Sequence, residues 1–130
     1  MKQSEPVVWW ATPVEIHSAI ARLHRLGTLG DVPKQAALDR LLVLSHGWRE
    51  ILPSDRLRDL AKGLFDTHSL HAADSLQLAA AMVWCQQKPA RREFVAGDLR
   101  LCEAASQAGF TVVRLGAGSR QKKSPCPTAC

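Results

Sequence analysis

Ten residues, AADSLQLAAA at positions 72–81, constrain the fold more than any other stretch, because they are apolar around nearly the whole circumference of a helix. A helix of this kind is normally buried by neighbouring elements. Asp74 is the single charged residue in the stretch, and a carboxylate among small apolar side chains needs a partner or a function. The structural alternative is that Asp74 lies in the first turn and complements the helix dipole.

Short β-branched and aromatic runs alternate with segments of helical spacing along the rest of the chain. Strands are expected at residues 6–10 (PVVWW), 49–52 (REIL), 93–96 (EFVA) and 111–115 (TVVRL). This alternation predicts an α/β fold with a mostly parallel sheet. Five helices are expected to fill the intervals, starting near Thr12, Asp31, Ser54 or Asp55, Ala72 and Leu99.

Local signals predict where the first helix begins, where the first and last helices end, and which face of the second helix packs. Thr12 is expected to cap the first helix, with Pro13 at the first helical position and Glu15 completing a capping box. Gly27 and Gly109 are expected to end the first and last helices. The second helix is expected to present a buried apolar seam, formed by Ala37, Leu41, Leu44 and Trp48.

Length and composition set the broad class of protein. The chain has 130 residues, enough for one domain with a hydrophobic core, expected over residues 1–115. No apolar run approaches the roughly 20 residues of a membrane span, so no membrane partner is expected. The net charge of +5 is compatible with a polyanionic partner such as nucleic acid. Residues 116–130 are polar and basic and are expected to form a disordered tail.

The chain contains four cysteines, and no pair of them has the C-x-x-C spacing of a zinc or redox motif. Reduced thiols in a cytoplasmic protein are the simplest interpretation. The four residues are Cys85, Cys102, Cys126 and Cys130.

Three carboxylates occupy comparable positions at the fronts of expected helices: Glu15, Asp74 and Asp98. Glu15 and Asp98 directly follow strands, and a parallel sheet gathers such positions at one edge. Clustered carboxylates repel one another unless a proton or a cation neutralises them, and oxygen ligands suit Mg²⁺ or Mn²⁺. Such an ion can activate water against a phosphodiester. Each acid taken alone has an adequate explanation as a helix cap.

Three segments of the sequence carry a resemblance to a known family. They are HSLHAADSLQLAAAMV at 68–83, FVAGDLRLCEAASQAGFTVV at 94–113 and VVWWATPVEIHSAIARL at 7–23. From about residue 7 to residue 115 the chain resembles the PIN-domain family, in particular the VapC-type toxin ribonucleases of bacterial toxin–antitoxin pairs.

The resemblance implies a three-layer α/β/α fold and a Mg²⁺-dependent endoribonuclease that cleaves RNA. It also implies that Glu15, Asp74 and Asp98 are catalytic and metal-binding acids, that a cognate antitoxin occludes the site, and that homodimers form. The family opens with an Asp-bearing strand and a helix, both of which precede the segment matched by residues 6–10. Relative to the family this sequence is therefore expected to be N-terminally truncated, without a strand from the middle of the sheet.

Two other functions are compatible with the same residues. A catalytically impaired PIN-like remnant would bind an antitoxin or RNA without turnover, and the missing family acid favours this alternative. A metabolic α/β domain would use the acids only as caps, but no Gly-rich phosphate loop or nucleophile elbow supports it.

Arginines near Asp98 in the sequence are the expected contacts to the RNA backbone, because Lys and Arg supply most phosphate contacts. The alternative for the two in the loop is that they only keep that loop solvated. The three residues are Arg91, Arg92 and Arg100.

Overall fold

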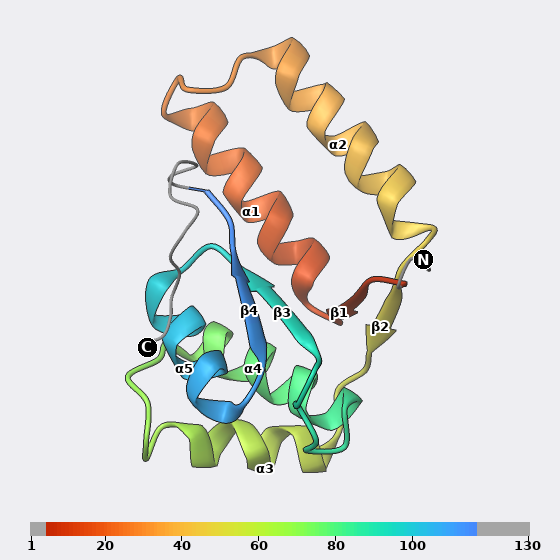
Figure 1. Cartoon of the computed structure of the whole chain (residues 1–130). Coiled ribbons are helices and arrows are strands. Elements are labelled where there is room, and N and C mark those ends of the chain that lie inside the picture. Colours follow the sequence, from red (N-terminus) through yellow and green to blue (C-terminus); the bar gives the residue numbers. More distant parts are fainter. Residues whose placement is uncertain (1–4, 117–130) are drawn as a thin grey trace. The chain divides into compact units, whose positions relative to one another are not determined.

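The computed structural model describes residues 5–116 (Figure 1). The chain forms two compact units, an N-terminal unit, Met1–Leu52, and a C-terminal unit, Pro53–Cys130. A single domain over residues 1–115 stays a prediction. The elements in chain order are β1 (Val7–Trp9), α1 (Thr12–Arg25), α2 (Asp31–Ser45), β2 (Arg49–Ile51), α3 (Asp55–Leu64), α4 (Ala72–Trp84), β3 (Glu93–Ala96), α5 (Leu99–Ala108) and β4 (Thr111–Arg114).

In the N-terminal unit, β1 pairs with β2 in parallel, with Val7 opposite Arg49 and Trp9 opposite Ile51. Helix α1 leaves the end of β1 and ends before Gly27, whose φ of +82° allows the Thr28 N–H to donate to the Leu23 carbonyl at 3.0 Å. The predicted helix stop at Gly27 is confirmed. Glycine suits this position because it adopts the left-handed conformation without a steric penalty.

The predicted capping box at the start of α1 is wrong. The N-cap is Ala11, no side chain caps the helix, and Thr12 is already its first helical residue. The Glu15 N–H donates to the Ala11 carbonyl at 3.1 Å. Because Thr12 lies inside the helix, its hydroxyl is not placed to accept from the first-turn N–H groups as an N-cap would.

The predicted seam of α2 is only partly correct. Leu41 is buried and Ala37 is partly buried, but the side chain of Leu44 is 48% exposed. The helix ends at Ser45, so Trp48 lies beyond it. The Ser45 hydroxyl donates to the Leu42 carbonyl at 2.7 Å. Serine competes for backbone partners in this way and so favours helix ends over helix interiors.

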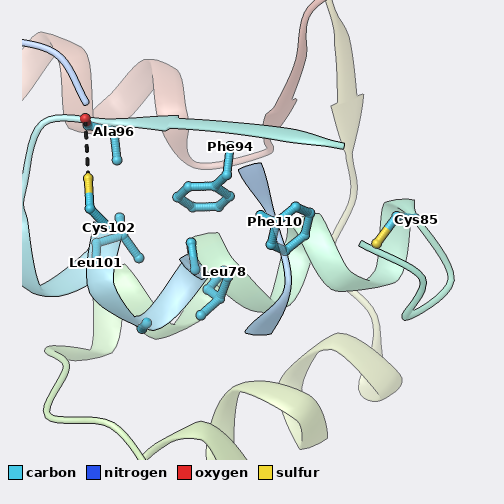
Figure 2. Close-up of a cluster of buried hydrophobic side chains, with 9 residues drawn as sticks. Leu78, Cys85, Phe94, Ala96, Leu101, Cys102 and Phe110 are labelled. Carbon is cyan, nitrogen blue, oxygen red and sulfur yellow. Dashed lines mark hydrogen bonds between the residues drawn. The ribbon is translucent and has the colours of Figure 1, made fainter. Parts of the chain in front are cut away.

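In the C-terminal unit, β3 pairs with β4 in parallel, and Phe94 lies opposite Val112. Side chains alternate along β3, so that Phe94 and Ala96 are buried while Glu93 and Val95 are exposed. Figure 2 shows the cluster of buried side chains on the inner face of this strand pair. The cluster joins β3 to α4 and α5 and consists of Leu78, Cys85, Phe94, Ala96, Leu101, Cys102, Ala104, Ala105 and Phe110.

Helix α4 is the central helix of the C-terminal unit, as its apolar composition predicts. Leu78, Ala79 and Ala80 are almost wholly buried. The hydroxyl of Ser75 is also buried and donates to the Ala61 carbonyl of α3 at 2.6 Å. This bond satisfies a buried polar group and fixes α4 against α3. The expectation of a buried helix at 72–81 is confirmed from Ser75 onward, whereas Ala72 and Ala73 are exposed.

The turn from α5 to β4 depends on glycine. Gly109 has a φ of +114°, and a Cβ added there would lie 2.9 Å from Cγ of Pro89, which belongs to the loop before β3. The predicted helix stop is confirmed, and the close approach brings two loops together at the start of the strand pair.

The fold class is mixed α/β with parallel strands, as predicted. Within residues 5–116, however, the four strands form two parallel pairs, β1–β2 and β3–β4, instead of one continuous sheet. No helix in that range is long and apolar enough to cross a bilayer. Cys85 and Cys102 are buried thiols, in line with their predicted reduced state. The predicted tail from residue 117 onward, with Cys126 and Cys130, lies outside the described residues.

Candidate functional site

Asp74 lies at the third position of α4, after the N-cap residue His71. Its carboxylate accepts a hydrogen bond from the His71 backbone N–H, and its Oδ2 lies 3.9 Å from Nδ1 of the His71 ring. The Asp74 side chain is 24% exposed, whereas the imidazole is largely in solvent. A carboxylate in the first helical turn also lies at the positive end of the helix dipole. Asp74 therefore has the structural role expected of it, which is to complement the helix dipole in the first turn of α4.

Asp98 lies directly beyond β3 and is the N-cap of α5. Its Oδ2 accepts a hydrogen bond from the Leu101 N–H at 2.9 Å. The same end of β3 is tied to α5 by Cys102, whose Sγ lies 3.6 Å from the Ala96 carbonyl oxygen (Figure 2). The cap uses one carboxylate oxygen, and a carboxylate can accept bonds at both. Asp98 is thus held at a fixed point, two residues past the last residue of β3.

The two aspartates lie near enough to interact electrostatically. Burial raises the pKa of Asp74 above its ordinary value, and the negative charge of Asp98 raises it further. The hydrogen bond from the His71 backbone and the proximity of the His71 ring lower that pKa and offset part of the effect. Repulsion between neighbouring carboxylates is relieved by a proton or a cation. The structure therefore brings together Asp74 and Asp98, two acids separated by a helix and a strand in the sequence.

Glu15 belongs to the N-terminal unit, where it lies partly buried in the first turn of α1. Asp74 and Asp98 belong to the C-terminal unit, and the convergence of Glu15 with them stays a prediction. Across residues 5–116, no group of three or more His, Cys, Asp or Glu side chains is arranged to hold a metal ion. What the C-terminal unit provides is a pair of acids, Asp74 and Asp98, which we call the acid pair.

The three arginines lie at opposite ends of β3. Arg100 is in the first turn of α5, two residues after Asp98, and is exposed. Arg91 and Arg92 come before β3, so the strand Glu93–Ala96 and then Gly97 separate them from Asp98. At roughly 3.3 Å per strand residue, β3 alone accounts for about 13 Å of this separation. Arg100 is therefore the arginine that lies beside the acid pair in the chain.

Two residues near these positions carry interactions that the sequence analysis did not assign. His71 contacts Asp74, and the signal that could have found it is the spacing of three between them on a helix end. Trp84 lies under Arg92, with the guanidinium carbon 5.0 Å from the ring centroid. A cation over the face of an indole ring is attracted by the ring quadrupole. The conformation of the loop between α4 and β3 brings this pair together.

Comparison of the chain with protein-family models, with curated proteins and with solved structures found no match. The likeness to PIN domains therefore rests on the sequence motifs alone.

Proposed function

We propose that this chain is a metal-dependent endoribonuclease of the PIN type, similar to VapC toxins, and that it cleaves RNA phosphodiester bonds. The observation that carries the proposal is the acid pair, in which burial and the charge of Asp98 raise the pKa of Asp74. Groups whose pKa is perturbed by burial together with a charged neighbour gather at functional sites more often than elsewhere. Both residues lie in the two segments that most resemble the family.

The donor chemistry of the acid pair fits a magnesium or manganese ion. Mg²⁺ is commonly held by one or two carboxylates, with water and substrate phosphates completing its shell. Asp74 and Asp98 would hold the ion, and Glu15 would add a third carboxylate in a PIN-like three-layer fold. When bound, such an ion supplies an activated water and stabilises negative charge on the phosphate.

The remaining residues of the site have separate roles. Arg100, exposed in the first turn of α5, would contact a phosphate oxygen next to the cleaved bond. The N-terminus of α5 adds backbone N–H groups and a positive dipole end. The proposal also includes a cognate antitoxin that covers the site, possible homodimers and a cytoplasmic location, all of which follow from the family resemblance.

The decisive test removes the charge of Asp98 while keeping its cap. Asparagine caps helices about as well as aspartate, so Asp98→Asn should leave the fold intact. We expect Mg²⁺-dependent cleavage of RNA by the wild-type chain and a loss of at least about 100-fold in Asp98→Asn and in Asp74→Asn. Cleavage would be followed with a fluorophore-quencher RNA, and folding by circular dichroism.

Asp66→Asn is the matched control, since Asp66 is an exposed aspartate of the same unit outside the acid pair. It should cleave like the wild type. Intact RNA after incubation with folded wild-type protein and Mg²⁺ or Mn²⁺ would refute the nuclease proposal.

A second candidate function is a PIN-like module that binds RNA or an antitoxin without turnover. It is favoured by the bonds that each acid already makes to backbone N–H groups, Asp98 to Leu101 and Asp74 to His71. These bonds give both acids a structural role that requires no metal. One experiment distinguishes the two candidate functions, because the binding module would bind RNA or antitoxin and show no RNA cleavage at any metal concentration.

A further inference from the structure

The loop between α4 and β3, residues 86–92, carries three cations and no acid in the sequence QQKPARR. We call it the basic loop. Its charged residues Lys88, Arg91 and Arg92 are all exposed, and the next acid along the chain is Glu93 at the start of β3. We propose that the basic loop binds backbone phosphates of the RNA at a point remote from the acid pair, so that the substrate is an RNA strand several nucleotides long.

The backbone of the basic loop is held in an unusual conformation. Gln86, Gln87 and Arg91 have φ values of +55°, +60° and +69°, which residues with a side chain rarely adopt. The loop is kept in place by the Gln87 N–H, which donates to the Met82 carbonyl at 2.8 Å, and by the Arg92 N–H, which donates to the Pro89 carbonyl at 2.9 Å. Strained backbone of this kind gathers at ligand-binding loops. A loop ordered before binding loses less entropy when it meets a ligand.

Arg92 is held by an aromatic ring as well as by the backbone. Its guanidinium carbon lies 5.0 Å from the centroid of the Trp84 ring, at the end of α4. Arg92 directly precedes β3, and its carbonyl accepts a hydrogen bond from the Thr111 N–H at 2.9 Å, so the pairing with β4 extends to Arg92. Strand alternation then puts Arg92 on the same side as the buried Phe94, which is the side that packs on α4. A guanidinium lying on a ring still presents N–H groups at its edge, and these match the geometry of a phosphate. Charge therefore favours a polyanion as the partner of this surface.

The position of the loop sets the length of the substrate. Between the basic loop and Asp98 lie the four residues of β3, about 13 Å along the strand, and then Gly97. At about 3.4 Å of axial rise per stacked nucleotide, the strand alone corresponds to about four nucleotides, so an RNA that contacts both sites is at least about that long. A dinucleotide would reach the acid pair without touching the basic loop, whereas a longer strand would contact both.

The experiment measures RNA binding, so its outcome does not depend on cleavage. Fluorescein-labelled single-stranded RNAs of two and of about eight nucleotides are titrated in an Asp98→Asn background, which prevents turnover. The test variant is Lys88→Gln with Arg91→Asn, because asparagine tolerates a positive φ. The matched control is Arg56→Gln with Lys62→Gln, two exposed cations of α3 in the same unit. Melting curves check that both variants fold.

We expect the test variant to bind the longer RNA roughly tenfold more weakly and to lower the slope of log affinity against log salt by about 1.4. The control should bind as the parent protein does, and the dinucleotide should bind equally to all. Equal losses in the test and control variants would overturn the proposal, as would a failure of the parent to bind the longer RNA. Unchanged RNA affinity with weakened binding of polyglutamate would overturn it in favour of an acidic protein partner.

The inference rests on the proposed function for what happens to the RNA after binding, and the two can fail separately. Loop-dependent RNA binding by a chain that never cleaves would refute the nuclease and support the basic loop. Cleavage that is insensitive to the loop variant, with unchanged affinity for the longer RNA, would refute the basic loop alone.

Discussion

The two units differ in how much apolar surface they bury. In the described part of the N-terminal unit the buried apolar residues are Trp9 and Leu41, and α1 has no buried residue at all. The C-terminal unit buries a continuous cluster across α4, β3 and α5. Because burial of apolar surface is the main stabilising contribution to folding, the C-terminal unit should account for most of the stability.

Apolar side chains on the N-terminal unit are exposed instead. Between α1 and α2 lies an open groove of about 480 Å³, with Val14, Ile20 and Leu38 among the residues that line it. At the end of α2, Leu42 and Val43 are each at least 60% exposed. The comparison shows that helical periodicity in the sequence is not enough to bury a helix face; a neighbouring element has to cover it.

The largest expected effect contrasts one leucine from each unit. Leu78→Ala should lower the free energy of unfolding by about 2–5 kcal/mol, because Leu78 is fully buried and its loss leaves a cavity. Leu42→Ala should change it by about 0.5 kcal/mol or less, because Leu42 is 60% exposed. Urea unfolding followed by circular dichroism measures both. A cost for Leu42→Ala as large as that for Leu78→Ala would mean that the face of α2 is covered in solution, and would break the comparison.

A smaller effect contrasts two glycines that end helices. Gly27 and Gly109 both have positive φ, so alanine at either position strains the backbone. Around Gly27 nothing lies within 4 Å of an added Cβ, and Gly27→Ala should cost about 1 kcal/mol. An added Cβ at Gly109 would meet Pro89, and Gly109→Ala should cost about 3 kcal/mol. Thermal melting of the two variants gives the ranking, and equal costs would show that Pro89 moves aside easily.

The smallest effect concerns pH. Because the pKa of Asp74 is raised in the folded state, ionisation of Asp74 opposes folding. Below pH 3.8 the carboxyl is protonated in both states and carries no penalty; as pH rises through the folded-state pKa, the wild type should lose stability relative to Asp74→Asn. Asp39→Asn, at an exposed position of α2, is the matched variant from the N-terminal unit and controls for the removal of one carboxylate. Urea unfolding midpoints of the two proteins, measured from pH 3 to pH 7, test this prediction. An increase in the stability of the wild type relative to Asp74→Asn as pH rises would contradict it.

Much of the local structure could be predicted from the sequence, because local hydrogen bonds and side-chain periodicity decide it. The caps of α3 and α5, where Ser54 and Asp98 accept from backbone N–H groups, are examples. The predicted cap of α1 failed by one residue, since Pro13 is compatible with more than one position in a first turn. The predicted seam of α2 failed at Leu44, whose exposure depends on neighbours that periodicity does not specify. It failed at Trp48 because the helix ends at Ser45.

The candidate site, too, could be predicted from the sequence only in part. The sequence alone identified Asp74 and Asp98 as acids at helix fronts, since each lies next to a recognisable helix start. Their mutual proximity and the raised pKa of Asp74 come from the packing of α4 and α5 around the shared cluster. The contact of Arg92 with the Trp84 ring depends on the loop between them, whose positive φ values at Gln86, Gln87 and Arg91 helical or strand periodicity does not predict.

The sequence by itself determined which segments form helices and strands, apart from the start of α1 and the end of α2, because local structure depends on neighbours within a few positions along the chain. Tertiary structure alone decided which acids meet, which apolar faces are buried, and that the four described strands form two pairs. The physical reason is that burial and electrostatic repulsion act between side chains brought together only when elements pack.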